Sequence, residues 1–344
     1  MEIKSFGELK DQRGIALHLQ NALNTGTLSH AYLIAGEDTA DTMEIAGALA
    51  GVLVCEDPQK REYPDGEFTV PCGKCPGCIR AIQDDHPDIT VLAPAKTSST
   101  GIDDIRGLMS DIRLLPYSAG YRVFIIPEAG KLTVQAQNAV LKTLEDPPEY
   151  AVLILLCRNF EGFLPTLLSR CVKLQLAPVP VRAIEEKTAA SGFARLIAAY
   201  ASGSMGKAIK LLEDSAFEDF AREASGLLCS LDTRSTYDIA AFAENVSGQD
   251  MTELFLFIMH VFVRDLLVMK SAGSSENLIL TGNIQYISEM AKRLSFQALN
   301  SMDKEVMTAE RRIYSRGNAR LVLEAALIMM RSEMTGMTLG GEPV

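Results

Sequence analysis

Residues 121–156 read YRVFIIPEAGKLTVQAQNAVLKTLEDPPEYAVLILL. The apolar runs at 122–126 and 151–156 have the length of buried strands. Between them, residues 133–145 show the apolar spacing of a helix, which two consecutive prolines then end. Since consecutive parallel strands need a long, usually helical connection, this strand–helix–strand order favours a parallel sheet.

The same alternation extends outward from this stretch. Further apolar runs at 31–35, 89–93 and 171–176 predict strands, and residues 102–114 predict an amphipathic helix. We therefore expect an α/β domain over residues 1–178, with helices on both faces of a parallel sheet. After the proline-rich APVPVR, apolar residues keep helical spacing, which predicts two all-helical domains over 179–215 and 216–344.

Composition excludes several classes of protein. The 344 residues carry a net charge of -11, which argues against a large basic surface for nucleic acid. No apolar run reaches the roughly 18 residues of a membrane span, and the N-terminus has no apolar signal core. We expect a cytoplasmic protein with no membrane partner. Its seven cysteines then indicate metal binding or packing rather than disulfides.

Four of the cysteines have the spacing of a metal site. Cys72, Cys75 and Cys78 form CGKCPGC, and Cys55 lies seventeen residues upstream of this run. Four thiolates at such spacing predict a tetrahedral structural Zn²⁺ site within residues 55–78. An iron–sulfur cluster or unliganded surface thiols are the alternatives. The segment has five acidic and three basic residues, which favours a structural clip over a DNA-binding finger.

The stretch GEDTADTM at 36–43 stands where a phosphate-binding loop would lie, between an apolar strand and a helix. A working loop reads G-x-x-x-x-G-K-[ST], whose lysine reaches the terminal phosphates and whose hydroxyl holds magnesium. Aligned from Gly36, the second glycine is Asp41, the lysine is Thr42 and the hydroxyl residue is Met43. The loop therefore has a negative charge in place of its phosphate ligands.

A second nucleotide element is also altered. The apolar strand that should end in a magnesium-binding acid ends instead in Pro127, followed by Glu128. Two independent losses predict a chain that binds no ATP and has no ATPase activity of its own. The other interpretation is an ordinary strand-to-helix turn that never held a nucleotide.

Several motifs together resemble a known family. Five motifs in this order, HAYLIAG, CGKCPGC, HPDI, residues 121–149 and LPTLLSRC, are similar to the delta-prime family of bacterial DNA polymerase III clamp-loader subunits, within the AAA+ superfamily. The resemblance covers about residues 1–215 and is most specific over 121–171. It implies a RecA-like AAA+ domain with a four-cysteine zinc module, a small helical lid at 179–215 and a helical collar at 216–344 that assembles a ring.

The resemblance also implies a function and partners. Delta-prime proteins are non-ATPase subunits that help to load the sliding clamp onto primed DNA during replication. The expected partners are the gamma/tau ATPase subunits and the delta subunit in a hetero-oligomeric ring, and through the complex the sliding clamp and primed DNA. The alternatives are an active AAA+ motor ATPase of the clamp loader, or a zinc-dependent nucleic-acid-binding module.

One residue carries the implied chemistry. Arg170 lies in the SRC motif, where the resemblance implies an arginine finger that reaches the ATP bound by the next subunit. A planar guanidinium suits this role because it stays charged and grips a phosphate through two hydrogen bonds. From the residues alone, Arg170 is better explained as a surface residue paired with a carboxylate. Arg106 and Arg113 are weaker candidates for contacts with DNA.

Overall fold

The computed structural model describes residues 4–64, 66–93, 99–248 and 251–336. The chain divides into two units, the first formed by residues 1–180 and 202–207 and the second by residues 181–201 and 208–344. Among the described residues, no helix is both long and apolar enough to cross a membrane.

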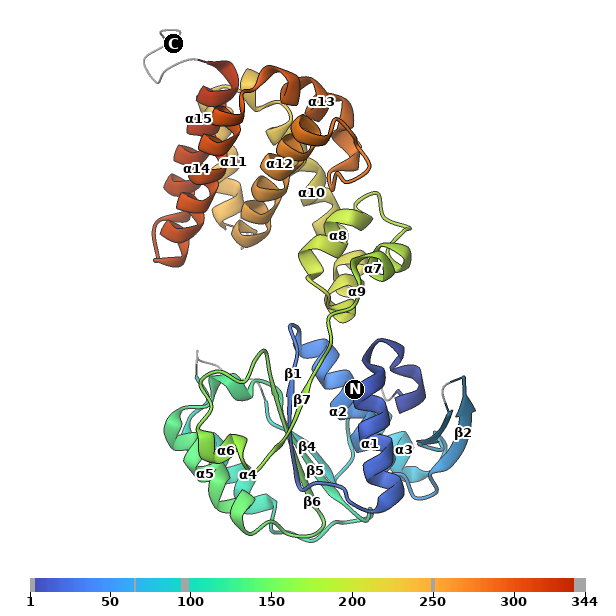
Figure 1. Ribbon diagram of the computed structural model, residues 1–344. Helices are drawn as coiled ribbons and strands as arrows, with labels where there is room; N and C mark the ends of the chain where they lie inside the picture. Colours follow the sequence, from blue (N-terminus) through green and yellow to red (C-terminus); the bar gives the residue numbers. More distant parts are fainter. Residues whose placement is uncertain (1–3, 65, 94–98, 249–250, 337–344) are drawn as a thin grey trace. The chain divides into compact units, whose positions relative to one another are not determined.

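Unit 1 is built on a five-stranded sheet in which all neighbouring strands are parallel (Figure 1). The strand order is β4-β5-β6-β1-β7, so the first strand of the unit lies between its last two strands. Strands β1 and β6 are buried along their whole lengths, as expected for the interior of a sheet covered on both faces. The strands are β1 (Ala31–Ala35), β4 (Ile89–Val91), β5 (Arg122–Ile126), β6 (Ala151–Cys157) and β7 (Val172–Gln175).

Helices cover both faces of this sheet, and the pleat divides the strand residues between them. Tyr32 and Ile34 pack with α1 (Arg13–Thr25) and α2 (Thr39–Leu53), whereas Leu33 packs with α4 (Ile102–Asp111) and α5 (Val134–Glu145) on the other face. The alternation follows from the two-residue period of a strand. The helices of unit 1 are α1 (Arg13–Thr25), α2 (Thr39–Leu53), α3 (Pro76–Ile82), α4 (Ile102–Asp111), α5 (Val134–Glu145) and α6 (Pro165–Leu168).

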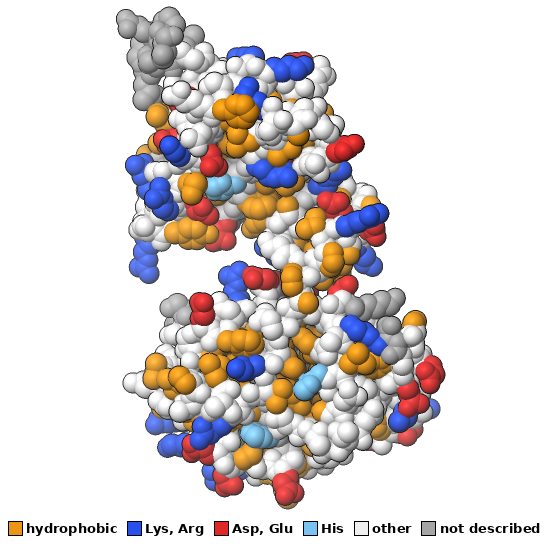
Figure 2. All heavy atoms as spheres, in the orientation of Figure 1, with side chains coloured by type: hydrophobic (Ala, Val, Ile, Leu, Met, Phe, Trp, Pro, Cys, Tyr) orange, Lys and Arg blue, Asp and Glu red, His pale blue; other side chains and the backbone are white. Residues whose placement is uncertain are grey.

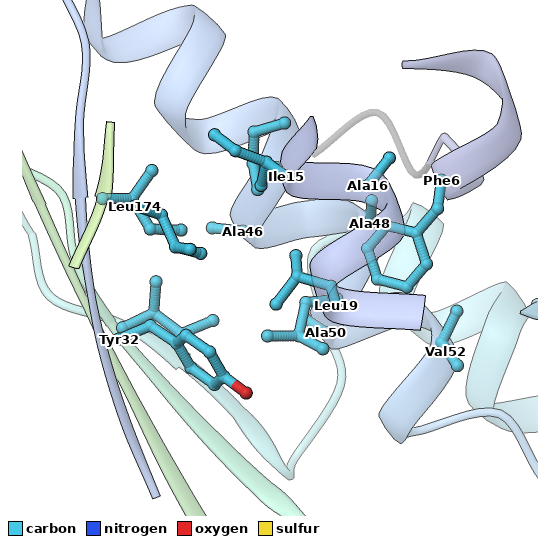
Figure 3. Close-up of a cluster of buried hydrophobic side chains, with 14 of the residues drawn as sticks. Phe6, Ile15, Ala16, Leu19, Tyr32, Ala46, Ala48, Ala50, Val52 and Leu174 are labelled. Atoms are coloured by element: carbon cyan, nitrogen blue, oxygen red, sulfur yellow. The ribbon is translucent and has the colours of Figure 1, made fainter. Parts of the chain in front are cut away.

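The small residues of α2 let it lie close to the sheet. Figure 3 shows Ala46 and Ala50 of α2 between side chains of α1, such as Leu19, and the strand residues Tyr32 and Leu174. These side chains are at most 7% exposed, so the core on this face is continuous from helix to sheet. Burial of this kind contributes roughly 25 cal/mol per Å² of apolar surface removed from water. This packing holds α2 against the sheet. The candidate site described below lies at the start of this helix.

Unit 2 is helical throughout its described residues. Its core includes an aromatic cluster in which Phe242 and Phe255 meet at 4.9 Å between ring centroids, and Phe220 packs against both. Its helices are α7 (Val181–Lys187), α8 (Ala194–Ala201), most of α9 (Met205–Glu213), α10 (Ser215–Leu228), α11 (Thr236–Gly248), α12 (Thr252–Ala272), α13 (Ile284–Arg293), α14 (Phe296–Tyr314) and α15 (Ala319–Thr335).

The predicted fold class, an α/β domain with a parallel sheet followed by a helical part, is confirmed. One pair of strands was not predicted. Strands β2 (Gln59–Tyr63) and β3 (Gly66–Val70) form a separate antiparallel hairpin inside the cysteine-containing segment. The sequence of β2, QKREY, is polar and mostly exposed, and GEFTV of β3 buries only Phe68 and Val70, so neither strand gives a continuous apolar run. The division of the helical part into domains at 179–215 and 216–344 stays a prediction.

Candidate functional site

The turn between β1 and α2 holds only Gly36, Glu37 and Asp38, because α2 already begins at Thr39. Two backbone N–H groups, one in this turn and one in the first turn of α2, donate hydrogen bonds to other groups of the protein. That of Gly36 donates to the carbonyl of Cys157 at 3.0 Å, and that of Ala40 donates to the Asp38 carboxylate at 2.7 Å. A phosphate loop instead leaves a ring of N–H groups for its ligand.

Asp41 has a partner from a distant part of the sequence. Its Oδ1 accepts a hydrogen bond of 2.7 Å from the backbone N–H of Gly206, in the first turn of α9. Both residues belong to unit 1. A Cβ atom on Gly206 would lie 2.8 Å from that same oxygen and 3.1 Å from the Cβ of Ala40, so the approach requires a glycine.

The bond between Asp41 and Gly206 is chemically favourable. The first N–H groups of a helix have no partner inside the helix, and negative charge is stabilised beside them. The Asp41 carboxylate therefore occupies, at the start of α9, the kind of position in which a helix would otherwise bind a phosphate oxygen. No local pattern marks Gly206, because its partner lies 165 residues away in the sequence.

The other altered loop residues also have structural roles. The hydroxyl of the buried Thr42 donates to the carbonyl of Thr39 at 3.0 Å. Met43 packs against the hydrophobic core. At the end of β5, the Glu128 carboxylate pairs with Lys131 at 2.6 Å. These side chains are thus engaged with protein groups or with the core.

Arg170 lies two residues after α6 and is held by two neighbours. Its Nη1 donates to the carbonyl of Thr166 at 3.0 Å, and its Nη2 donates to Oε1 of Glu145 at 3.1 Å. Glu145 is the last residue of α5, so the pair joins α5 to the segment after α6. The side chain of Arg170 remains 36% exposed. A guanidinium carries five N–H donors, so this arrangement leaves others for an external anion.

The four cysteines at 55, 72, 75 and 78 meet in space. Their Sγ atoms all lie within 4.8 Å of one another, with 4.0 Å between Cys55 and Cys75 and 3.9 Å between Cys72 and Cys78. Two thiolates on a tetrahedral Zn²⁺, each about 2.3 Å from the metal, are separated by about 3.8 Å. The cluster can hold a metal ion, and its geometry fits zinc.

The backbone around the cluster orients the sulfur atoms. Three cysteine sulfurs accept N–H hydrogen bonds, from Cys72 to Cys55, from Cys75 to Cys72 and from Cys78 to Cys75, at 3.2–3.3 Å. The backbone N–H groups of Lys74 and Cys75 lower the pKa of Cys72 to about 7, which favours its thiolate form. A thiolate is the form in which cysteine binds metal.

The cysteines are carried by short elements that pack tightly. Cys55 follows α2, Cys72 follows the β2–β3 hairpin, and Cys75 caps α3. Gly77 is required because a Cβ there would lie 2.4 Å from the carbonyl oxygen of Val54. His86 lies outside the group of possible metal ligands found among the described residues, which consists of these four cysteines, and its Nδ1 accepts a hydrogen bond of 3.0 Å from the backbone N–H of Asp88.

The two candidate DNA-contacting arginines of the 102–114 region have different surroundings. Arg106 is exposed on α4 and forms a surface pair with Asp103 at 3.2 Å. Arg113 lies after the end of α4, is exposed, and its carbonyl accepts a hydrogen bond from Tyr150. Neither observation tests a role in DNA binding, which stays a prediction for both residues.

Comparison with known proteins gives consistent matches. The family model for the DNA polymerase III delta subunit matches residues 11–180. The chain is 27% identical to DNA polymerase III subunit tau of Bacillus subtilis over 94% of its own length, but spans only 61% of that relative. It is 24% identical to the delta' subunit of the same organism, covering 91% of this chain and 94% of the relative.

Among solved structures, the chain is similar to a DNA polymerase III gamma subunit-related protein from Thermotoga maritima. The identity is 21%, with 92% of this chain and 99% of that chain covered, and the TM-score is 0.46.

Proposed function

Because the chain belongs to the family of DNA polymerase III clamp-loader subunits, we propose that it is a subunit that hydrolyses no ATP itself and supplies Arg170 to a neighbour's nucleotide. Its partners are then the gamma/tau and delta subunits, and through the complex the sliding clamp and primed DNA. The match to a delta' subunit along 94% of that relative favours this assignment over a tau-type ATPase.

The observation that carries the proposal is the hydrogen bond from Gly206 to Asp41. A nucleotide here would bring its phosphate charges to a carboxylate that already binds the start of α9. Thr42 and Met43 offer neither the lysine nor the exposed hydroxyl that a phosphate loop uses to offset and hold those charges. The turn of three residues leaves little backbone to surround a phosphate.

Arg170 supports the second part of the proposal. Charge develops on the transferred phosphoryl group, and an arginine supplied by another subunit stabilises it, an effect of about 10³ to 10⁵ in rate for such fingers. Glu145 and the carbonyl of Thr166 hold the side chain by one N–H each. We infer that these contacts order the guanidinium before it meets the neighbour's nucleotide, which lowers the entropy cost of binding.

The four-cysteine cluster has a structural role in this proposal. Cys55, Cys72, Cys75 and Cys78 would hold Zn²⁺, which closes the segment that contains the β2–β3 hairpin and α3. A structural site of four protein ligands leaves no open position for water or substrate. The metal therefore takes no part in the ATP chemistry.

The direct test of the first part is nucleotide binding by the isolated chain. Titration with a fluorescent ATP analogue and magnesium should give no saturable binding in the concentration range where an isolated gamma/tau subunit binds. Saturable binding that competes with ATP and is lost on substitution of residues 36–43 would revive the motor ATPase interpretation. The zinc-dependent nucleic-acid interpretation would be supported by DNA binding that disappears when the metal is removed.

A further inference from the structure

Four arginines gather where α14 joins α15 in unit 2. Residues 311–321 read RRIYSRGNARL and contain Arg311, Arg312, Arg316 and Arg320 with no aspartate or glutamate among them. We call this segment the arginine tip. Figure 2 shows Lys and Arg side chains along the edge of unit 2 on which α14 and α15 lie. In a chain whose net charge is -11, such a local excess of positive charge is unusual and needs a physical reason.

The backbone of the arginine tip is held in a defined turn. The N–H of Gly317 donates to the carbonyl of Arg312 at 2.8 Å, and the N–H of Arg316 donates to Ile313 at 2.9 Å. Arg316 adopts the left-handed conformation with φ of 63°. Asn318 then caps α15 through the N–H of Leu321 at 3.1 Å. The arginines therefore project from a fixed turn, so a ligand would not have to order the backbone first.

The positive charges of the tip are weakly compensated. Within the described part of the chain, Arg312 and Arg316 form no side-chain hydrogen bond or ion pair. Among the residues that the structure describes, the side chain of Arg311 bonds to Met307 and Thr308 of its own helix and to no acidic group. Arg320 pairs with Glu244 at 3.3 Å, with both side chains well exposed, and such a surface pair contributes little. Like charges carried on one short segment repel one another, and a bound anion would relieve that repulsion.

An exposed aromatic ring lies among these charges. Tyr314 is 67% exposed at the end of α14, and Leu321 is 62% exposed at the start of α15. Bases stack on exposed aromatic rings while neighbouring arginines and lysines bind the backbone phosphates. An acidic peptide would use the charges but would gain little from the face of the tyrosine. The combination therefore favours nucleic acid over an acidic protein.

We propose that the arginine tip binds single-stranded nucleic acid, with Arg311, Arg312 and Arg316 on phosphates and Tyr314 stacked on a base. A single strand fits better than a duplex because its bases are free to stack on Tyr314. The proposal does not depend on the role of Arg170 in ATP hydrolysis. It assigns to unit 2 a nucleic-acid contact that is separate from the four-cysteine cluster.

The test is fluorescence anisotropy of a labelled oligo(dT) strand titrated with the full chain at about 50 mM salt, where phosphate contacts are strong. The double variant Arg312→Ala/Arg316→Ala should bind at least tenfold more weakly. It should also lower the slope of log affinity against log salt by about 1.4, or roughly 0.7 per lost phosphate contact. The matched control, Arg182→Ala/Arg222→Ala, removes the same charge from exposed arginines of unit 2 and should bind as the wild type does.

Tyr314→Ala separates the two classes of partner. It should weaken binding by about fivefold or more while leaving the salt slope unchanged, because stacking releases no counterions. Thermal melting of each variant checks that the fold is kept. The proposal is overturned if the wild type does not bind the strand, or if both double variants lose affinity equally. It is also overturned if Tyr314→Ala binds normally and poly-glutamate competes as well as DNA, which would indicate an acidic protein partner.

Discussion

The carboxylate of Asp41 and the backbone N–H of Gly206 lie 2.7 Å apart, joined by a hydrogen bond across 165 positions of the sequence. The aspartate stands at the position of the second glycine in a phosphate loop, and its partner begins a helix. The bond gives the carboxylate a structural role at the start of α9. It is also directly accessible to mutation.

Loss of this bond should destabilise unit 1. We expect Asp41→Ala to lower the free energy of unfolding by about 1 kcal/mol, as for removal of other side chains that cap helix N-termini. Asp41→Asn keeps an oxygen acceptor and should cost less. Gly206→Ala should also destabilise, since its Cβ would lie 2.8 Å from the Asp41 carboxylate. Urea unfolding of Asp41→Ala, Gly206→Ala and the double variant measures the coupling energy between the two residues. If the two losses of stability simply add, the hydrogen bond does not couple them, which would contradict the account.

Removal of metal should unfold the segment around the cysteines. We expect one Zn²⁺ per chain by elemental analysis, and no iron. A chelator should open amide hydrogen exchange across residues 55–82, because the binding energy of a structural metal contributes to folding. Cys72→Ser should do the same, whereas Cys229→Ser, outside the cluster, should retain the metal. The zinc site would be refuted if carefully purified protein contained no metal and the four cysteines of the cluster reacted as free thiols.

Asp88 predicts a specific dependence of stability on pH. Burial by itself raises the pKa of Asp88, but the N–H groups of Tyr117, Ser118 and Ala119 outweigh burial and hold the pKa below its usual value. A lowered folded-state pKa stabilises the fold above the unfolded value of about 3.9. This contribution is lost as the pH falls through the folded-state pKa.

The measurement is the difference in unfolding free energy between wild type and Asp88→Asn. It should be largest near neutral pH and shrink below about pH 4, where the unfolded aspartate is protonated. Asp103→Asn, at an exposed position on α4, should show no such trend. A difference that stays constant down to about pH 2 would show that the charge of Asp88 is not what stabilises the loop.

Much of unit 1 could be predicted from local sequence. The strands at 31–35, 122–126 and 151–156 are continuous apolar runs, because they are buried on both faces of the sheet. The cysteine spacing likewise predicted the cluster. The β2–β3 hairpin could not be predicted in this way, because β2 is polar and exposed and β3 contributes only two buried residues, Phe68 and Val70, too short an alternation to identify a strand.

The partners of the key side chains were beyond the reach of local patterns. Glu145 and Arg170 are 25 residues apart, and their pairing depends on how α5 packs beside the segment after α6. Two roles were expected for Arg170, a surface ion pair from its residue type and an arginine finger from the family resemblance. The ion pair is present in the structure. A half-buried guanidinium with spare N–H donors is compatible with both descriptions, so the finger stays a prediction.

Glu145 should affect ATP hydrolysis only through Arg170. In a loader reconstituted with clamp and primed DNA, we expect Glu145→Ala to lower the maximal turnover rate severalfold while the KM for ATP stays unchanged. Glu145→Gln retains the Oε1 acceptor and should recover most of the rate. If Glu145→Gln is as impaired as Glu145→Ala, or if Glu145→Ala still lowers the rate when Arg170 is already alanine, then Glu145 does not act by positioning the arginine.

The most direct test of the central claim is ATP turnover by the reconstituted loader containing Arg170→Ala, with gel filtration to show that the ring assembles. Arg182→Ala, an exposed arginine of unit 2, is the control for loss of one surface charge. The account predicts that the ring still forms with Arg170→Ala. Clamp-stimulated turnover should fall by at least tenfold at the ATP site of the neighbouring subunit that Arg170 would reach. An assembled ring with turnover and clamp loading equal to the wild type would contradict it.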